Sequence, residues 1–100
     1  MTRQRLPNRR FKETFEFTHE GVGFTASYGR DVQGRVKELF LSGGKAGSVI
    51  EAMMCDASTA ISIALQNGVE PTDLAHSVVR NPDSTPASPI GVVLDDMVMG

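Results

Sequence analysis

The sequence contains 100 residues, of which 40% are hydrophobic and 22% are charged, a composition ordinary for one globular domain with a single core. No apolar run approaches the roughly 18 residues of a membrane span, and no apolar signal segment follows the basic N-terminus, so we expect neither membrane insertion nor export. Cys55 is the single cysteine, which excludes an internal disulfide and predicts a reducing, cytoplasmic location.

The net charge of −2 conceals an uneven distribution of charged residues. Residues 1–50 carry nine Lys or Arg against five Asp or Glu, whereas residues 51–100 carry one against seven. Five of the ten basic residues lie within residues 1–12, which we interpret as a basic N-terminal arm before one α+β domain at residues 13–100. Such an arm can hold a phosphate or an acidic partner, and a solvated tail is the simpler interpretation.

The first half of the chain has the alternating pattern of β-strands. Residues 11–18, 22–29 and 36–42 each place apolar side chains on one parity and polar or small side chains on the other. The links between these segments are short, and Gly34 in the second link can adopt a positive φ. The pattern therefore predicts three strands in an antiparallel meander.

The second half has the three- and four-residue periodicity of helices. One broad stripe predicts a long helix with these residues facing the core: Ile50, Met53, Met54, Ala57, Ile61, Ala64 and Leu65. Ser48 and Glu51 form a capping box at its start, and Asn67-Gly68 ends it. Cys55 lies beside the stripe, and we expect a small core or boundary residue there.

Two shorter helices are predicted after the long one. The first covers residues 71–79, and the second starts at Ser88-Pro89 with one apolar side made of Ile90, Val93, Leu94 and Met97. The expected fold class is therefore α+β. An antiparallel sheet of three strands, or slightly more, is followed by a long helix and two shorter helices that pack on one face.

The segment LFLSGGKAGS, residues 39–48, has the context of an anion-binding loop. A strand ends there, Gly43, Gly44 and Gly47 permit close backbone approach, and a helix N-terminus follows. Lys45 adds a positive charge, but the phosphate-loop signature is absent and Ser48 and Glu51 already supply an acceptor and a negative charge. We interpret the segment first as a capped strand-to-helix turn and second as an anion site.

Several separated motifs resemble the TSCPD domain family. They are Leu6-Pro7 with Arg9-Arg10, Gly34-x-x-x-Glu38-x-Phe40, Gly44-Lys45-x-Gly47-Ser48, Ser62-x-x-Leu65-x-x-Gly68 and the helix start at Ser88-Pro89. This family occurs at the C-terminal end of many adenosylcobalamin-dependent ribonucleotide reductases and as stand-alone small proteins. Two cysteines of the family pattern are replaced here by Asn81 and Ser88, so the resemblance transfers neither a metal site nor a redox pair.

The resemblance implies a stand-alone accessory or interaction domain related to ribonucleotide reductase and deoxyribonucleotide synthesis. We expect no catalysis by the chain alone, although relatives carry the reductase name, because reduction needs a radical initiator and paired cysteines. The expected partner is a reductase subunit or another acidic protein, or a nucleotide phosphate. The candidate contacts are Arg9, Arg10, Gly43, Gly44, Lys45, Gly47 and Ser48.

Two other functions remain open. One is a small nucleotide- or phosphate-binding regulatory protein that uses the GGKAGS loop, and the other is an inhibitor or binding protein with an unrelated macromolecular target. We expect no cofactor and no metal, because His19 and His76 have no second ligand at metal spacing, and no carboxylate pair, because the adjacent Asp95 and Asp96 diverge on a helix. The negative net charge disfavours nucleic acid, whereas the wide helical stripe makes a second copy of the chain a candidate partner.

Overall fold

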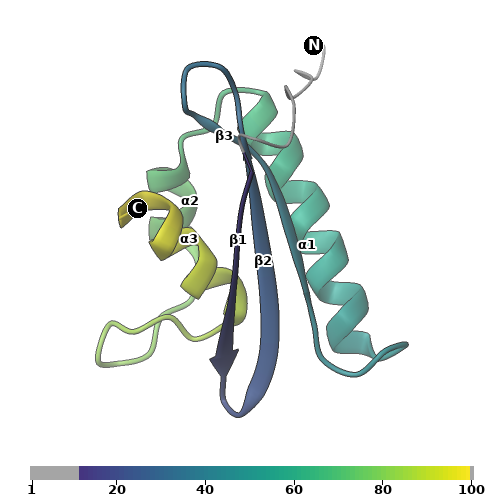
Figure 1. Ribbon diagram of the computed structural model, residues 1–100. Helices are drawn as coiled ribbons and strands as arrows, with labels where there is room; N and C mark the ends of the chain where they lie inside the picture. Colours follow the sequence, from purple (N-terminus) through teal and green to yellow (C-terminus); the bar gives the residue numbers. More distant parts are fainter. Residues whose placement is uncertain (1–11, 100) are drawn as a thin grey trace.

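In the computed structural model, which describes residues 12–99, three strands are followed by three helices (Figure 1). The strands are β1 (Lys12–His19), β2 (Val22–Arg30) and β3 (Val36–Gly43), and the helices are α1 (Val49–Gln66), α2 (Pro71–Ser77) and α3 (Pro89–Met99). The strands pair antiparallel in the order β1-β2-β3. The predicted fold class, an α+β meander followed by one long and two short helices, is confirmed.

The two faces of the sheet differ in polarity, as the alternation of side chains predicts. On β2, Phe24, Ala26 and Tyr28 are buried, and four of their six cross-strand partners are also large and apolar: Phe15, Phe17, Leu39 and Leu41. The opposite face is polar, and the hydroxyl oxygens of Thr14 and Ser27 lie 3.0 Å apart there. The helices therefore supply their apolar side chains to one face of the sheet.

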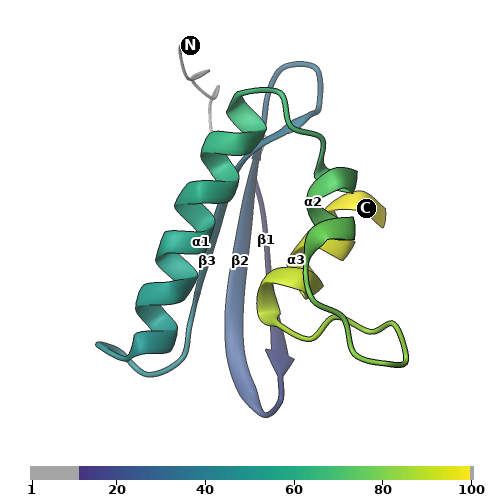
Figure 2. The same cartoon turned by 180° about the vertical axis from the view of Figure 1, so that it is seen from behind.

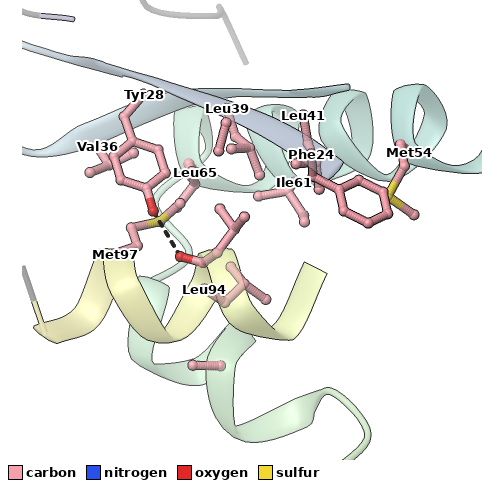
Figure 3. Packing of buried hydrophobic residues seen from close by; sticks show 13 residues of the cluster. Phe24, Tyr28, Val36, Leu39, Leu41, Met54, Ile61, Leu65, Leu94 and Met97 are labelled. Atoms are coloured by element: carbon pink, nitrogen blue, oxygen red, sulfur yellow. Dashed lines mark hydrogen bonds between the residues drawn. The ribbon is translucent and has the colours of Figure 1, made fainter. Parts of the chain in front are cut away.

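The core lies between this sheet face and the helices α1 and α3 (Figure 3). Leu94 and Met97 of α3 are buried there, which confirms the predicted apolar side of the last helix. The Tyr28 hydroxyl oxygen lies 2.9 Å from both the Val93 carbonyl oxygen and Asp96 Oδ2, and its single proton is shared between these two acceptors. Burial, together with the hydrogen bond to Asp96, raises the pKa of Tyr28 well above its usual range, so the phenol stays a neutral donor that ties α3 to β2.

The buried face of α1 differs from the predicted stripe. Met54, Ile61 and Leu65 are buried as expected, but Ile50 is 49% exposed and Met53 is 58% exposed. Cys55, expected at the core or its boundary, is exposed as well. The periodicity located the helix correctly, but the stripe was too wide to show which part of it faces the sheet.

Two serines explain the orientation of α1, which runs alongside β3 (Figures 1 and 2). The backbone N–H groups of Leu39 and Leu41 donate to Ser62 Oγ and Ser58 Oγ, both at 2.9 Å. Ser62 Oγ also donates to the Leu39 carbonyl at 3.0 Å. Because β3 is an edge strand, its outward backbone groups need partners, and the serines of α1 supply them.

By length and composition alone, α1 could cross a membrane, since its 18 residues have a mean hydropathy of 1.2. The helix contains Glu51 and Asp56, so it is not an uninterrupted apolar run of that length. The contacts of the helix give a different picture, because Ile61 and Leu65 enter the core and Ser58 and Ser62 bond β3. These are the contacts of a helix packed on a sheet.

Candidate functional site

The glycines of the predicted loop have structural reasons to be glycines. A Cβ atom at Gly43 would lie 2.2 Å from the Phe24 ring, closer than any side chain permits. Gly44 and Gly47 have φ values of 79° and 78°, in the left-handed region that favours glycine. The turn from β3 into α1 therefore requires these residues without reference to a ligand.

The N-terminus of α1 is capped by the side chains of Ser48 and Glu51. The Glu51 N–H donates to Ser48 Oγ at 3.2 Å, and the Gly47 N–H donates to Glu51 Oε1 at 2.8 Å. The predicted capping by Ser48 and Glu51 is confirmed, although Glu51 reaches Gly47 instead of Ser48. The carboxylate lies at the helix N-terminus, the position that favours negative charge, while Lys45 is exposed.

Only part of the predicted contact set lies within the described residues. Arg9 and Arg10 lie outside the described residues, and the described chain begins at Lys12, which pairs with Gly29. Lys45 lies two residues after Gly43, which ends β3 at the other end of the sheet. A strand of eight residues spans roughly 26 Å. The structure therefore places Lys45 far from the point where the arm joins the sheet.

The two adjacent carboxylates of α3 have separate partners. Arg80 Nη1 donates to Asp95 Oδ2 at 2.9 Å, and this hydrogen bond lowers the pKa of Asp95. Asp96 accepts from the Tyr28 hydroxyl. The divergence predicted for the pair is confirmed, so they do not form an acid-base couple. Across residues 12–99, no three His, Cys, Asp or Glu side chains gather in a way that could hold a metal.

The chain matches a known protein family over most of its length. The family model described as "TSCPD domain" matches residues 2–89. The chain belongs to the TSCPD domain family.

A curated relative supports the connection with ribonucleotide reductase. The vitamin B12-dependent ribonucleotide reductase of Agrobacterium fabrum (strain C58 / ATCC 33970) is 39% identical to this TSCPD domain over 67 residues. The match covers 67% of the domain but only 5% of the relative. No solved structure matches the chain.

The structure assigns fold-determining roles to much of one TSCPD motif, Ser62-x-x-Leu65-x-x-Gly68. Ser62 bonds the edge of β3, and Leu65 is 1% exposed in the core. Gly68 has a φ of 94°, and the Val69 N–H donates to the Ala64 carbonyl at 3.0 Å, which closes α1 in a Schellman motif. This motif therefore specifies how α1 ends and how it lies against the sheet.

The positions of the two replaced family cysteines lie in the connection from α2 to α3. Asn81 Nδ2 donates to Thr85 Oγ1 at 3.1 Å within this loop. Ser88 Oγ accepts from the Gly91 N–H at 3.2 Å at the start of α3. In this TSCPD domain both positions therefore hold polar side chains that stabilise a turn and a helix start.

Motif residues without such a structural role are better candidates for function. Phe40 of β3 is 52% exposed on the polar face of the sheet, although it belongs to a TSCPD motif. Lys45 has no ion pair within the described part of the chain. The sequence alone could not separate these residues from their neighbours, because exposure depends on how the elements pack.

Several exposed apolar residues lie on a face of α1 that points away from the sheet. We define the outer α1 face by its exposed apolar residues: Val49, Ile50, Met53, Ala60 and Ile63. Val49 is 74% exposed and Ile63 is 42% exposed. The width of the apolar stripe in the sequence signals this face. Ile50 and Met53 of this face were predicted to lie in the core, because the sequence pattern does not show that serines line the buried side of α1.

Proposed function

We propose that this TSCPD domain is a non-catalytic accessory domain of ribonucleotide reduction that binds the body of a reductase through the outer α1 face. The relative supports the pathway, since its name is that of a vitamin B12-dependent ribonucleotide reductase. The matched segment is 5% of that protein, so the related segment there is attached to a much larger chain. An accessory domain with a docking face suits that arrangement.

The apolar character of α1 on both sides carries this proposal. Met54, Ile61 and Leu65 fill the core, while Val49 and Met53 on the other side are 74% and 58% exposed. Exposed Asp56 lies on the same side of α1, three residues after Met53 and four before Ala60, so the outer α1 face is apolar around one carboxylate. Exposed apolar patches accompanied by polar residues mark interaction sites. The outer α1 face is therefore the surface with most to gain from a partner.

The charges near the outer α1 face define the partner's chemistry. The acidic residues of α1 are Glu51 and Asp56, and the helix contains neither Lys nor Arg. Complementarity thus favours a partner with an apolar centre and a basic rim. A reductase in the cytoplasm is the partner that we propose, and the chain itself contributes no catalytic group to the reaction.

The Gly–Lys loop, residues 43–48, is a second candidate contact. Lys45 is exposed and has no carboxylate partner within residues 12–99, so its ammonium can meet an acidic group of the reductase or a nucleotide phosphate. Calorimetric titration with ribo- and deoxyribonucleoside triphosphates tests the second option. Binding that is lost in Lys45→Ala supports a nucleotide site at Gly43, Gly44, Lys45, Gly47 and Ser48. Binding that is unchanged in that variant removes the loop from consideration.

The docking proposal is tested by calorimetry against a vitamin B12-dependent ribonucleotide reductase from the organism that encodes the chain. We expect Met53→Glu to weaken binding at least about tenfold, or about 1.4 kcal/mol, because it places a charge in an apolar contact. Met99→Glu is the matched control, since Met99 is 87% exposed on α3. Equal affinities for the wild type and Met53→Glu would contradict the proposal.

A further inference from the structure

A small cavity opens at the end of the sheet opposite the Gly–Lys loop. Its volume is about 230 Å³. Arg30 at the end of β2, Arg35 in the turn and Lys37 at the start of β3 line it from one side. The connection from α1 to α2 contributes Gly68, Val69 and Glu70. In Figures 1 and 2 this turn and the α1–α2 connection lie at the same end of the molecule. Three cations thus face the cavity with one carboxylate among its lining residues.

Lys37 is the unusual member of this group because it is buried. It is only 9% exposed, and its Nζ donates to the Leu65 carbonyl at 3.2 Å. An ammonium has three N–H donors, and within residues 12–99 this is the one hydrogen bond that Lys37 makes, with no carboxylate in ion-pair contact. A buried cation without a counter-ion is costly, so a bound anion would relieve that cost.

The C-terminus of α1 accounts for only part of the position of Lys37. A cation is favoured beside the last carbonyls of a helix, and Leu65 lies in the last turn of α1. The Leu65 carbonyl also accepts from the Gly68 N–H at 3.2 Å, so this turn is already closed by the backbone. Capping therefore uses one donor of Lys37 and does not require a lysine at this position.

The arginines are held at the rim by neighbours that use only some of their donors. Arg30 pairs with Glu13 and donates to the Gly34 carbonyl at 2.9 Å, while Arg35 Nε lies 3.3 Å from Asp31 Oδ2. Each guanidinium has five N–H donors, so both can still contact an anion. The cavity is smaller than the roughly 300 to 1,000 Å³ of pockets that enclose drug-sized ligands. It fits a small anion better than a whole nucleotide.

We propose that this cavity binds a phosphate group, with the Lys37 ammonium as its central donor and Arg35 at its rim. The site is separate from the outer α1 face and from the Gly–Lys loop. Its occupancy is therefore independent of the docking proposed above, and a failure of either proposal leaves the other standing.

The test is an amide NMR titration with inorganic phosphate, against sodium chloride at equal ionic strength. We expect saturable shifts at residues 34–37 and 68–70 in the wild type and in Lys45→Met. Lys37→Met, which keeps the apolar stem of the side chain, is expected to show no saturation. Arg35→Gln is expected to bind about tenfold more weakly, because one charge-assisted hydrogen bond is lost. Because the Arg35 side chain is 62% exposed, Arg35→Gln is expected to fold, and it tests phosphate binding if Lys37→Met does not fold.

A parallel titration with adenosine 5′-monophosphate identifies the source of the phosphate. Tighter binding than that of inorganic phosphate means that the cavity holds the phosphate of a larger molecule, and equal binding means that the group alone is recognised. Saturation that persists unchanged in both Lys37→Met and Arg35→Gln would overturn the proposal. So would an absence of saturable shifts at residues 34–37 and 68–70, or shifts confined to residues 43–48.

Discussion

Ser58 and Ser62 are the residues that determine how α1 lies against the sheet. They occupy the buried side of α1 and bond the N–H groups of Leu41 and Leu39. Periodicity finds apolar residues at helical spacing, but it does not show that an edge strand will need hydroxyl partners. For this reason the position of α1 along the chain could be predicted, whereas its buried face could not.

Replacement of Ser62 by alanine tests this role. The change leaves the buried N–H and carbonyl of Leu39 without a partner, and we expect the free energy of unfolding to fall by about 2 kcal/mol. Urea denaturation measures it. Thr59→Ala on the same helix is the control, because Thr59 is exposed and, within residues 12–99, its hydroxyl bonds only the Cys55 carbonyl. Equal losses in the two variants would show that the contact with β3 contributes little.

Replacement of Tyr28 by phenylalanine tests the link between β2 and α3. The hydroxyl bonds the Val93 carbonyl oxygen and Asp96 Oδ2, so its removal takes away the polar link from β2 to α3 while the ring remains. We expect a loss of about 1 to 2 kcal/mol in unfolding free energy, measured by thermal or urea denaturation. Hydrogen exchange should rise mainly in α3. An unchanged stability would mean that apolar packing alone holds this helix.

At the scale of elements, the turn between β2 and β3 is organised by one buried carboxylate. Asp31 is 1% exposed, and its Oδ1 accepts from the N–H groups of Gln33 and Arg35 at 2.9 and 3.0 Å. Gly34 has the predicted positive φ, 83°. Turn-forming residues made this turn predictable from the sequence. The burial of Asp31 was not predictable, because it depends on Arg35 folding back onto it.

This turn makes the stability depend on pH. Burial of Asp31 disfavours its charged form, but the hydrogen bonds from Arg35 and Gln33 and the Arg35 charge outweigh that effect and lower its pKa. Because the folded pKa lies below the ordinary value of about 3.9, the ionised carboxylate stabilises the fold above roughly pH 4. This stabilisation is lost as the pH falls through the folded pKa.

The Asp31→Asn variant measures how much the ionised Asp31 carboxylate contributes to the stability of the fold. We expect the variant to unfold at lower urea concentration than the wild type at pH 7, and the difference to shrink by pH 3. Asp95, whose pKa is lowered by Arg80, keeps some acid sensitivity in both proteins. A difference between the two proteins that stays constant from pH 7 to pH 3 would contradict the assignment.

At the scale of the whole molecule, the sequence predicted the order and type of the elements but not which surfaces they leave open. Lys45 lies at one end of the sheet, whereas Lys37 and its cavity lie at the other. Because Ser58 and Ser62 occupy the side of α1 that faces β3, several of its apolar residues lie on the outer α1 face. Local patterns specify elements, but the placement of exposed groups results from packing between segments distant in the chain.

The docking of the outer α1 face on a reductase is the central claim. Size-exclusion chromatography with light scattering tests it most directly, on the chain alone and mixed with the vitamin B12-dependent reductase of its own organism. We expect a mass of 10.8 kDa for the chain alone, co-elution with the reductase in the mixture, and no co-elution for Met53→Glu. A mass about twice that value for the chain alone, reduced by Met53→Glu, would show that a second copy covers the face. That result, or separate elution in the mixture, would contradict the account.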